Sequence, residues 1–148
     1  MRMLLAAAIV ALASPALAQS PATWTETSNG QGYGLILTPK GGPAVLSLAC
    51  VRGTSEVLAI AYGLMPAPGQ QEFVVRFDQR RVTFVVKPEA MKDGKMVQAS
   101  AKAGPALLTS IRTAKTVSAE YAGSRLGPFA APPPAMGQAF SRRCGPLI

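Results

Sequence analysis

Two cysteines, Cys50 and Cys144, are the side chains of this 148-residue sequence best suited to covalent chemistry. In an exported chain, an even number of cysteines indicates a disulfide, and two cysteines allow one intrachain pairing, Cys50 with Cys144. Such a bond would close a loop spanning most of the chain, which in the chain-entropy model stabilises the fold by about 4–5 kcal/mol. Two free thiols, or a bridge to another molecule, are the alternatives that the sequence leaves open.

Catalytic chemistry is sparsely represented. The sequence has no histidine, which excludes Ser-His-Asp and Cys-His catalysis and imidazole metal sites. Ser100-Ala101-Lys102 has one residue fewer between serine and lysine than the S-x-x-K dyad requires. A hydrolase could still use two carboxylates, for which Glu72 and Asp78 are the candidates. We therefore predict no enzymatic activity, no cofactor and no metal site, with a carboxylate-dependent hydrolase as the less favoured alternative.

The first eighteen residues have the layout of a secretory signal peptide. Arg2 supplies a short basic start, residues 4–13 are apolar, and Ala16-Leu17-Ala18 matches an A-x-A cleavage site. An uncleaved membrane anchor is the alternative, but the apolar run is short for a bilayer. We expect cleavage after residue 18 and a periplasmic or secreted location, with no transmembrane anchor left. Residues 19–148 then form a single disulfide-stapled β-domain.

The chain is basic, with 15 Lys and Arg against seven Asp and Glu and a formal net charge of +8. Loss of Arg2 with the signal peptide lowers this to +7. Basic proteins favour anionic partners, although solubility alone also explains the charge. The cations form no run, since Arg80-Arg81 and Arg142-Arg143 are only pairs. This scattered pattern, without a recognition motif, argues against nucleic acid as the partner.

Short strands dominate the hydrophobic pattern. Residues 71–77 (QEFVVRF) and 81–87 (RVTFVVK) alternate apolar and polar positions around a short turn, which predicts a β-hairpin with one buried face. Residues 44–52 and 56–63 are apolar at nearly every position, which is typical of central strands covered on both faces. Further strands are predicted at residues 33–38, 96–101 and 116–122, and an Asp93-Gly94 turn signal precedes residue 96.

Two helices interrupt this pattern. Residues 106–114, after Gly104-Pro105, place Leu107, Leu108 and Ile111 on one stripe. Residues 135–143 follow a proline stretch and form a second short helix that ends beside Cys144. Residues 123–129 are predicted to be a loop. The connections are too short for repeated crossover helices, so the fold class is mainly β. We expect an antiparallel sandwich or partly open barrel with one short internal helix and a short C-terminal helix.

Several segments resemble one family of exported proteins. They are the LSLAC of residues 46–50, the LAIAY of 58–62, the VVRFD of 74–78 and the AFSRRC of 139–144. Their layout resembles the VasI/TagO-type accessory proteins associated with type VI secretion, and related small periplasmic domains of unknown function. The family pattern places a tryptophan after the Arg-Phe-Asp strand, where this chain has Phe84 in the hairpin. The resemblance implies a non-enzymatic envelope domain and transfers no site residues.

The favoured function is an exported interaction or accessory module that docks on another envelope protein. The alternative is a binder of an acidic envelope polymer or lipid, for which the exposed hairpin face offers a basic surface made of Arg76, Arg80, Arg81 and Lys87. A periplasmic inhibitor of an envelope enzyme is a further form of binding protein. Like-charge repulsion disfavours a basic lysozyme as the target of such an inhibitor.

Overall fold

A computed structural model describes residues 21–87 and 96–145 of the chain. The predicted signal peptide and the Asp93-Gly94 turn lie outside the described residues. Nine strands form one antiparallel sheet with the order β1-β2-β3-β4-β7-β6-β5-β8-β9. In chain order the strands are β1 (Ala22–Asn29), β2 (Gly32–Pro39), β3 (Leu46–Val51), β4 (Glu56–Tyr62), β5 (Glu72–Phe77), β6 (Arg80–Val86), β7 (Met96–Lys102), β8 (Thr116–Tyr121) and β9 (Ser124–Ala130).

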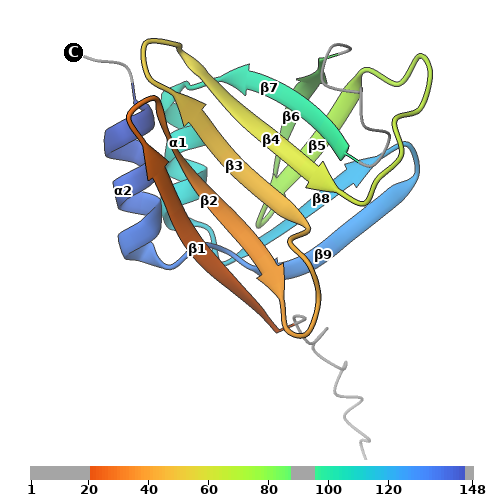
Figure 1. Ribbon diagram of the computed structural model, residues 1–148, viewed down its shortest axis with the longest axis horizontal. Coiled ribbons are helices and arrows are strands. Elements are labelled where there is room, and N and C mark those ends of the chain that lie inside the picture. The colour runs from red at the N-terminus through yellow and green to blue at the C-terminus, as the bar shows by residue number, and fades with distance from the viewer. Residues whose placement is uncertain (1–20, 88–95, 146–148) are drawn as a thin grey trace, which may run out of the picture.

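The sheet curls into a barrel that stays open between its edge strands β1 and β9 (Figure 1). One hydrogen bond crosses this seam, because the Trp24 indole Nε1 on β1 donates to the carbonyl oxygen of Ala130 at the end of β9 at 2.8 Å. Trp24 is itself buried, so the single tryptophan of the chain is a core residue. The predicted mainly β fold class is confirmed, in its partly open barrel form.

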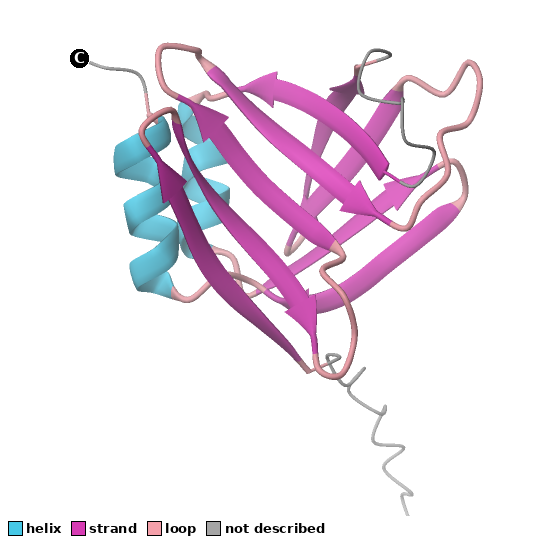
Figure 2. Ribbon diagram, viewed as in Figure 1, coloured by secondary structure: helices cyan, strands magenta, loops and turns pink. Residues whose placement is uncertain are grey.

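Two helices lie together at one end of the barrel, α1 (Pro105–Thr113) and α2 (Pro134–Cys144) (Figure 2). Both begin with a proline in the first turn, where the missing N–H costs no helical hydrogen bond. The predicted stripe of α1 is buried as expected. The helices approach closely at Gly137 of α2, where a Cβ atom would come within 2.9 Å of the Cα of Arg112. A glycine is therefore required at this helix crossing.

The predicted hairpin is β5 paired with β6, with Phe73 opposite Phe84. Both phenylalanine rings are fully buried and meet edge to face at a centroid distance of 6.4 Å. The same inner surface continues through the leucines of β2 and β3. Alternating apolar side chains of the curled sheet thus fill the barrel interior.

Two sequence predictions about strands are wrong. Residues 123–129 are not a loop, because β9 occupies most of them and pairs with β8. Gly127 and Pro128 interrupt the strand pattern in the sequence. Because β9 lies at the sheet edge, its proline removes no ladder hydrogen bond. The pairing with β8 shifts register between Val117 and Ala119. Strands β3 and β4 are also not covered on both faces, because no described helix or strand lies over their outer side (Figure 1).

Candidate functional site

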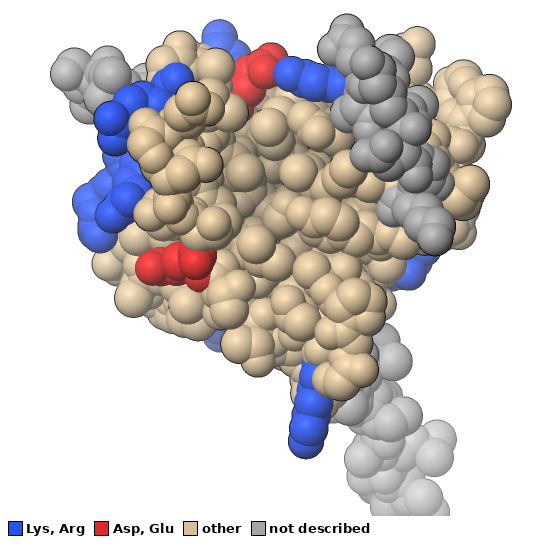
Figure 3. Space-filling model, viewed as in Figure 1, with Lys and Arg blue, Asp and Glu red and all other residues tan. Residues whose placement is uncertain are grey.

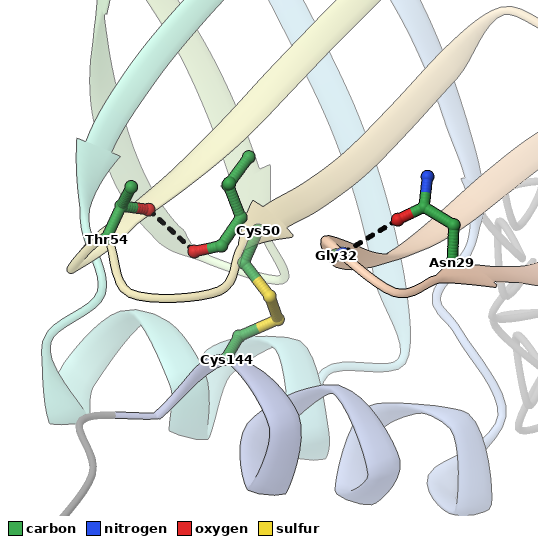
Figure 4. Close-up of a disulfide and its surroundings, with 6 residues drawn as sticks. Asn29, Gly32, Cys50, Thr54 and Cys144 are labelled. Carbon is green, nitrogen blue, oxygen red and sulfur yellow. Dashed lines mark hydrogen bonds between the residues drawn. A yellow bond between two sulfur atoms is a disulfide. The ribbon is translucent and has the colours of Figure 1, made fainter.

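Cys50, on β3, and Cys144, at the end of α2, form a disulfide with their Cα atoms 5.6 Å apart (Figure 4). Both cysteines are 5% exposed, so the bond belongs to the core. The predicted intrachain pairing is therefore confirmed, and the alternatives of free thiols or an intermolecular bridge are excluded. The bond fixes the end of α2 to the C-terminal end of β3.

A hollow of about 510 Å³ opens beside this disulfide. Its walls come from the β1–β2 turn, the β3–β4 turn and the last turn of α2, and they carry Arg52, Arg142 and Arg143. The Asn29 side-chain oxygen closes the first turn by accepting hydrogen bonds from the backbone N–H groups of Gln31 and Gly32, each at 2.9 Å (Figure 4). The hollow is thus a concave, arginine-lined site built on tight turns.

Tyr33 forms the inner wall of the hollow. Its hydroxyl donates a hydrogen bond of 2.8 Å to Oε1 of Glu26, and its ring lies 4.9 Å below the Arg143 guanidinium. Burial and the Glu26 carboxylate together raise the pKa of Tyr33 to about 12, against the opposing charges of Arg143 and Arg142. The tyrosine therefore stays neutral at physiological pH and serves as a platform for Arg143.

Three of the four cations of the predicted basic surface on the hairpin pair with carboxylates. Arg76 and Arg81 lie directly opposite each other on β5 and β6, but Lys87 lies at the far end of β6 and Arg80 lines hollows beside α1. The ion pairs are Arg76 with Glu120 at 3.6 Å, Arg81 with Glu72 at 3.9 Å and Lys87 with Glu56 at 3.0 Å. The four cations therefore do not form one free basic patch.

The two candidate catalytic carboxylates are also separated. Glu72 begins β5 and pairs with Arg81, whereas Asp78 follows the end of that strand. The Asp78 carboxylate accepts backbone hydrogen bonds from Lys115 at 3.0 Å and Thr116 at 2.9 Å. Partial burial raises the pKa of Asp78, but these hydrogen bonds outweigh it and hold the pKa below its usual value. Asp78 thus joins the hairpin turn to the start of β8, which is a structural role.

The outer side of strands β1 to β4 and β7 is a second candidate site. In Figure 3 the strands β1 to β4 and β7 present a broad area without Lys, Arg, Asp or Glu, and charged side chains appear around its margin. We call this area the uncharged face. Its residues, placed by the strand register, are Thr25, Thr27, Gly34, Ile36, Ser47, Ala49, Leu58, Ile60, Tyr62, Gln98 and Ser100, with Val85 of β6 beside them.

Apolar side chains occupy the centre of the uncharged face. Leu58 and Ile60 of β4 and Ile36 of β2 are half-buried, and Val85 is 60% exposed. A shallow hollow of about 230 Å³ lies on the neighbouring strands, where Gly34 and other small residues line it. The face therefore has apolar side chains at its centre and a shallow depression beside them.

Sequence reasoning missed both features. The signal for the arginine-lined hollow was present, since Arg52 follows Cys50 by two residues and Arg142-Arg143 directly precedes Cys144. Pairing the cysteines therefore also brings the three arginines together. The signal for the uncharged face was the apolar character of both pleats of β3 and β4, which we had interpreted as burial on both sides.

Fold and sites together define a small, disulfide-closed, partly open β-barrel with a helical pair at one end. Comparison with models of protein families, with curated proteins and with solved structures finds no match for this chain. No described helix is long and apolar enough to cross a membrane. Within residues 21–87 and 96–145, no three potential metal ligands come together.

Proposed function

We propose that this protein is an exported, non-enzymatic accessory module of the bacterial envelope that docks on another envelope protein through the uncharged face. The observation that carries the proposal is that the described residues of this face include no Lys, Arg, Asp or Glu, in a chain with a net charge of +8. An inhibitor of an envelope enzyme is one form that such docking can take.

The size and composition of the face support a protein partner. Five strands spaced about 4.8 Å apart, each contributing roughly 20 Å of length, give a patch of roughly 400 Å². The apolar centre of Leu58, Ile60 and Ile36 covers only part of this area, and the threonine, serine and glutamine side chains around it match the polar rim of a protein–protein interface. Leu58 and Ile60 at its centre keep apolar surface in contact with water, and docking would remove that surface at roughly 25 cal/mol per Å².

An uncharged surface offers nothing to an anionic polymer or lipid, which would seek the cations elsewhere on the molecule. Of the hairpin cations proposed for such binding, Arg76, Arg81 and Lys87 are paired with Glu120, Glu72 and Glu56. This charge compensation lowers the rank of that alternative relative to protein docking.

Export is supported by two features of the chain. A buried disulfide is typical of oxidising compartments, and residues 1–18 have the layout of a signal peptide. The resemblance of residues 46–50 and 139–144 to the VasI/TagO-type accessory proteins points to the same class.

The test is site-specific photocrosslinking in living cells that express the full chain. A photoreactive residue replaces Ile60, at the centre of the uncharged face, or Gln79, an exposed turn residue on the hairpin that serves as the control. We expect one protein adduct from position 60 and none from position 79. Because apolar docking is not screened by ions, the partner should stay bound to the untreated protein at high salt.

A matched pair of substitutions sharpens the test. Ile60→Arg and Gln79→Arg add the same charge, but only Ile60→Arg places it where a docked partner would have to desolvate it. Ile60→Arg should weaken capture at least about tenfold, with Gln79→Arg unchanged. Equal crosslinking at both positions, or loss of the partner at high salt, would contradict the proposal. An adduct of two copies of this chain would replace it with self-association.

A further inference from the structure

The arginine-lined hollow beside the disulfide has a chemistry that the uncharged face does not need. We propose that Arg52, Arg142 and Arg143 form a binding site for a phosphate monoester or pyrophosphate group. Arg52 comes from the turn after β3, and the two other arginines come from the last turn of α2. The hollow adjoins the shallow depression of the uncharged face and shares Tyr33 and Cys50 with it, but the three arginines line only the hollow.

The first argument is the missing counter-charge. No carboxylate in the described part of the chain forms a salt bridge with any of the three arginines. Glu26 accepts from the Tyr33 hydroxyl, Glu56, Glu72 and Glu120 hold other cations, and Asp78 holds the backbone of Lys115 and Thr116. No described acidic residue lines the hollow, so its three arginines have no anionic partner among the described lining side chains.

The second argument is preorganisation. The Arg143 guanidinium lies over the ring of Tyr33, which is held by its hydrogen bond to Glu26 and by the neighbouring ring of Phe140 at 6.0 Å. The Arg52 backbone N–H donates to the carbonyl oxygen of Gln31 at 2.7 Å, which fixes the opposite wall. The Arg143 side chain is therefore held in place before a ligand arrives, which reduces the conformational entropy that this side chain loses on binding.

The disulfide holds these two walls in register. Cys50 and Arg52 lie on one side, and Cys144 and Arg143 lie on the other, although the cysteines are 94 residues apart in sequence. A covalent bond close to Arg52 on one wall and to Arg142 and Arg143 on the other holds the two walls together while their charges repel one another. Such repulsion is tolerated where an anion relieves it on binding.

The third argument identifies the ligand group. Guanidinium groups present planar donors that match phosphate oxygens, often in a bidentate way. The C-terminal end of α2 contributes only about half a negative charge at this site, which leaves a strong positive surplus suited to a dianion. A hollow of about 510 Å³ falls within the range of small-molecule sites and accommodates a phosphate with part of its carrier.

Isothermal titration calorimetry with inorganic pyrophosphate at low salt tests the site. The untagged protein can be purified by cation exchange, because its sequence pI is about 10.1. Arg143→Gln and Arg52→Gln each remove one guanidinium from the hollow, and Arg80→Gln removes one exposed guanidinium outside it. We expect saturable binding that falls about tenfold or more in each hollow variant and less than about twofold in Arg80→Gln.

Two results would overturn the proposal. One is the absence of saturable pyrophosphate binding by the unaltered protein. The other is an equal loss in Arg80→Gln, which would show that net charge alone drives the attraction. Circular dichroism of each variant checks that it is folded. If loss of the contact with Tyr33 destabilises Arg143→Gln, the binding measured with Arg52→Gln decides the test.

A vesicle assay separates the sources of the phosphate group. Phosphatidylcholine vesicles are prepared with or without phosphatidic acid, a lipid phosphomonoester. Capture of the phosphatidic acid vesicles that is lost in Arg143→Gln would assign the site to a lipid headgroup. Binding of soluble pyrophosphate without vesicle capture would assign it to a free phosphate compound.

Discussion

Removing the disulfide should cost the fold about 4–5 kcal/mol. The Cys50–Cys144 bond closes a loop with a sequence separation of 94, and the chain-entropy model gives this magnitude for a loop of that length. Since small domains are stable by about 5–15 kcal/mol in total, the bond accounts for a large share of the stability. The change is the double variant Cys50→Ala/Cys144→Ala, because alanine leaves no polar group in these buried positions.

Urea unfolding followed by far-ultraviolet circular dichroism measures the effect. The oxidised protein, the reduced protein and the double variant are compared at the same pH and temperature. The reduced protein and the variant should unfold at similar urea concentrations, both well below that of the oxidised protein. Hydrogen exchange should show that the amides of α2 lose more protection than those of β3, since the helix then depends on packing alone.

A loss of less than about 1.5 kcal/mol would refute the entropy reasoning, because it would mean that the unfolded chain gains little freedom when the loop opens. A reduced protein much more stable than the double variant would instead assign the effect to packing of the sulfur atoms.

Two further predictions concern hydrogen bonds that join distant segments. Trp24→Phe removes the seam bond and orphans the Ala130 carbonyl oxygen, so we expect a loss of about 2–3 kcal/mol in thermal unfolding, whereas the exposed Thr25→Ala on the same strand should change little. Asp78→Asn should cost about 1 kcal/mol at pH 7 after screening by solvent. Because the folded-state pKa of Asp78 is lowered, this difference is present above the usual aspartate pKa and is lost as the pH falls through the folded-state value. Urea titrations of both proteins at pH 7 and at about pH 3 check the sign, and a difference that grows in acid would contradict it.

Local pattern was sufficient to predict the hairpin of β5 and β6. Phe73, Val75 and Phe77 recur at every second position, as do Val82, Phe84 and Val86 on the partner strand, so both the pairing and the buried face follow from local sequence. Helix α1 was predictable for the same reason, because a proline starts it and one apolar stripe runs along it. The disulfide followed from the count of two cysteines.

The pairing of β9 and the exposure of the outer face of β4 depend on distant segments, and they were not predictable from local sequence. Strand β9 carries Gly127 and Pro128, which read as a loop until β8 supplies its pairing. The outer side chains Leu58 and Ile60 have the composition of a buried face, but the topology places no described element over them. Hydrophobic pattern reports which side chains avoid water, and it does not separate burial in the core from an interaction surface.

The seam of the barrel can form only late in folding. Trp24 lies on the first strand and Ala130 at the end of the last one, so the bond between them joins the two ends of the domain. During synthesis, the edge of β1 can contact β9 only after nearly the whole chain has been made. Contacts of such long sequence separation slow folding and leave the β1 edge open to other strands in the interval. The newly made chain is therefore most prone to aggregation just before β9 has been synthesised.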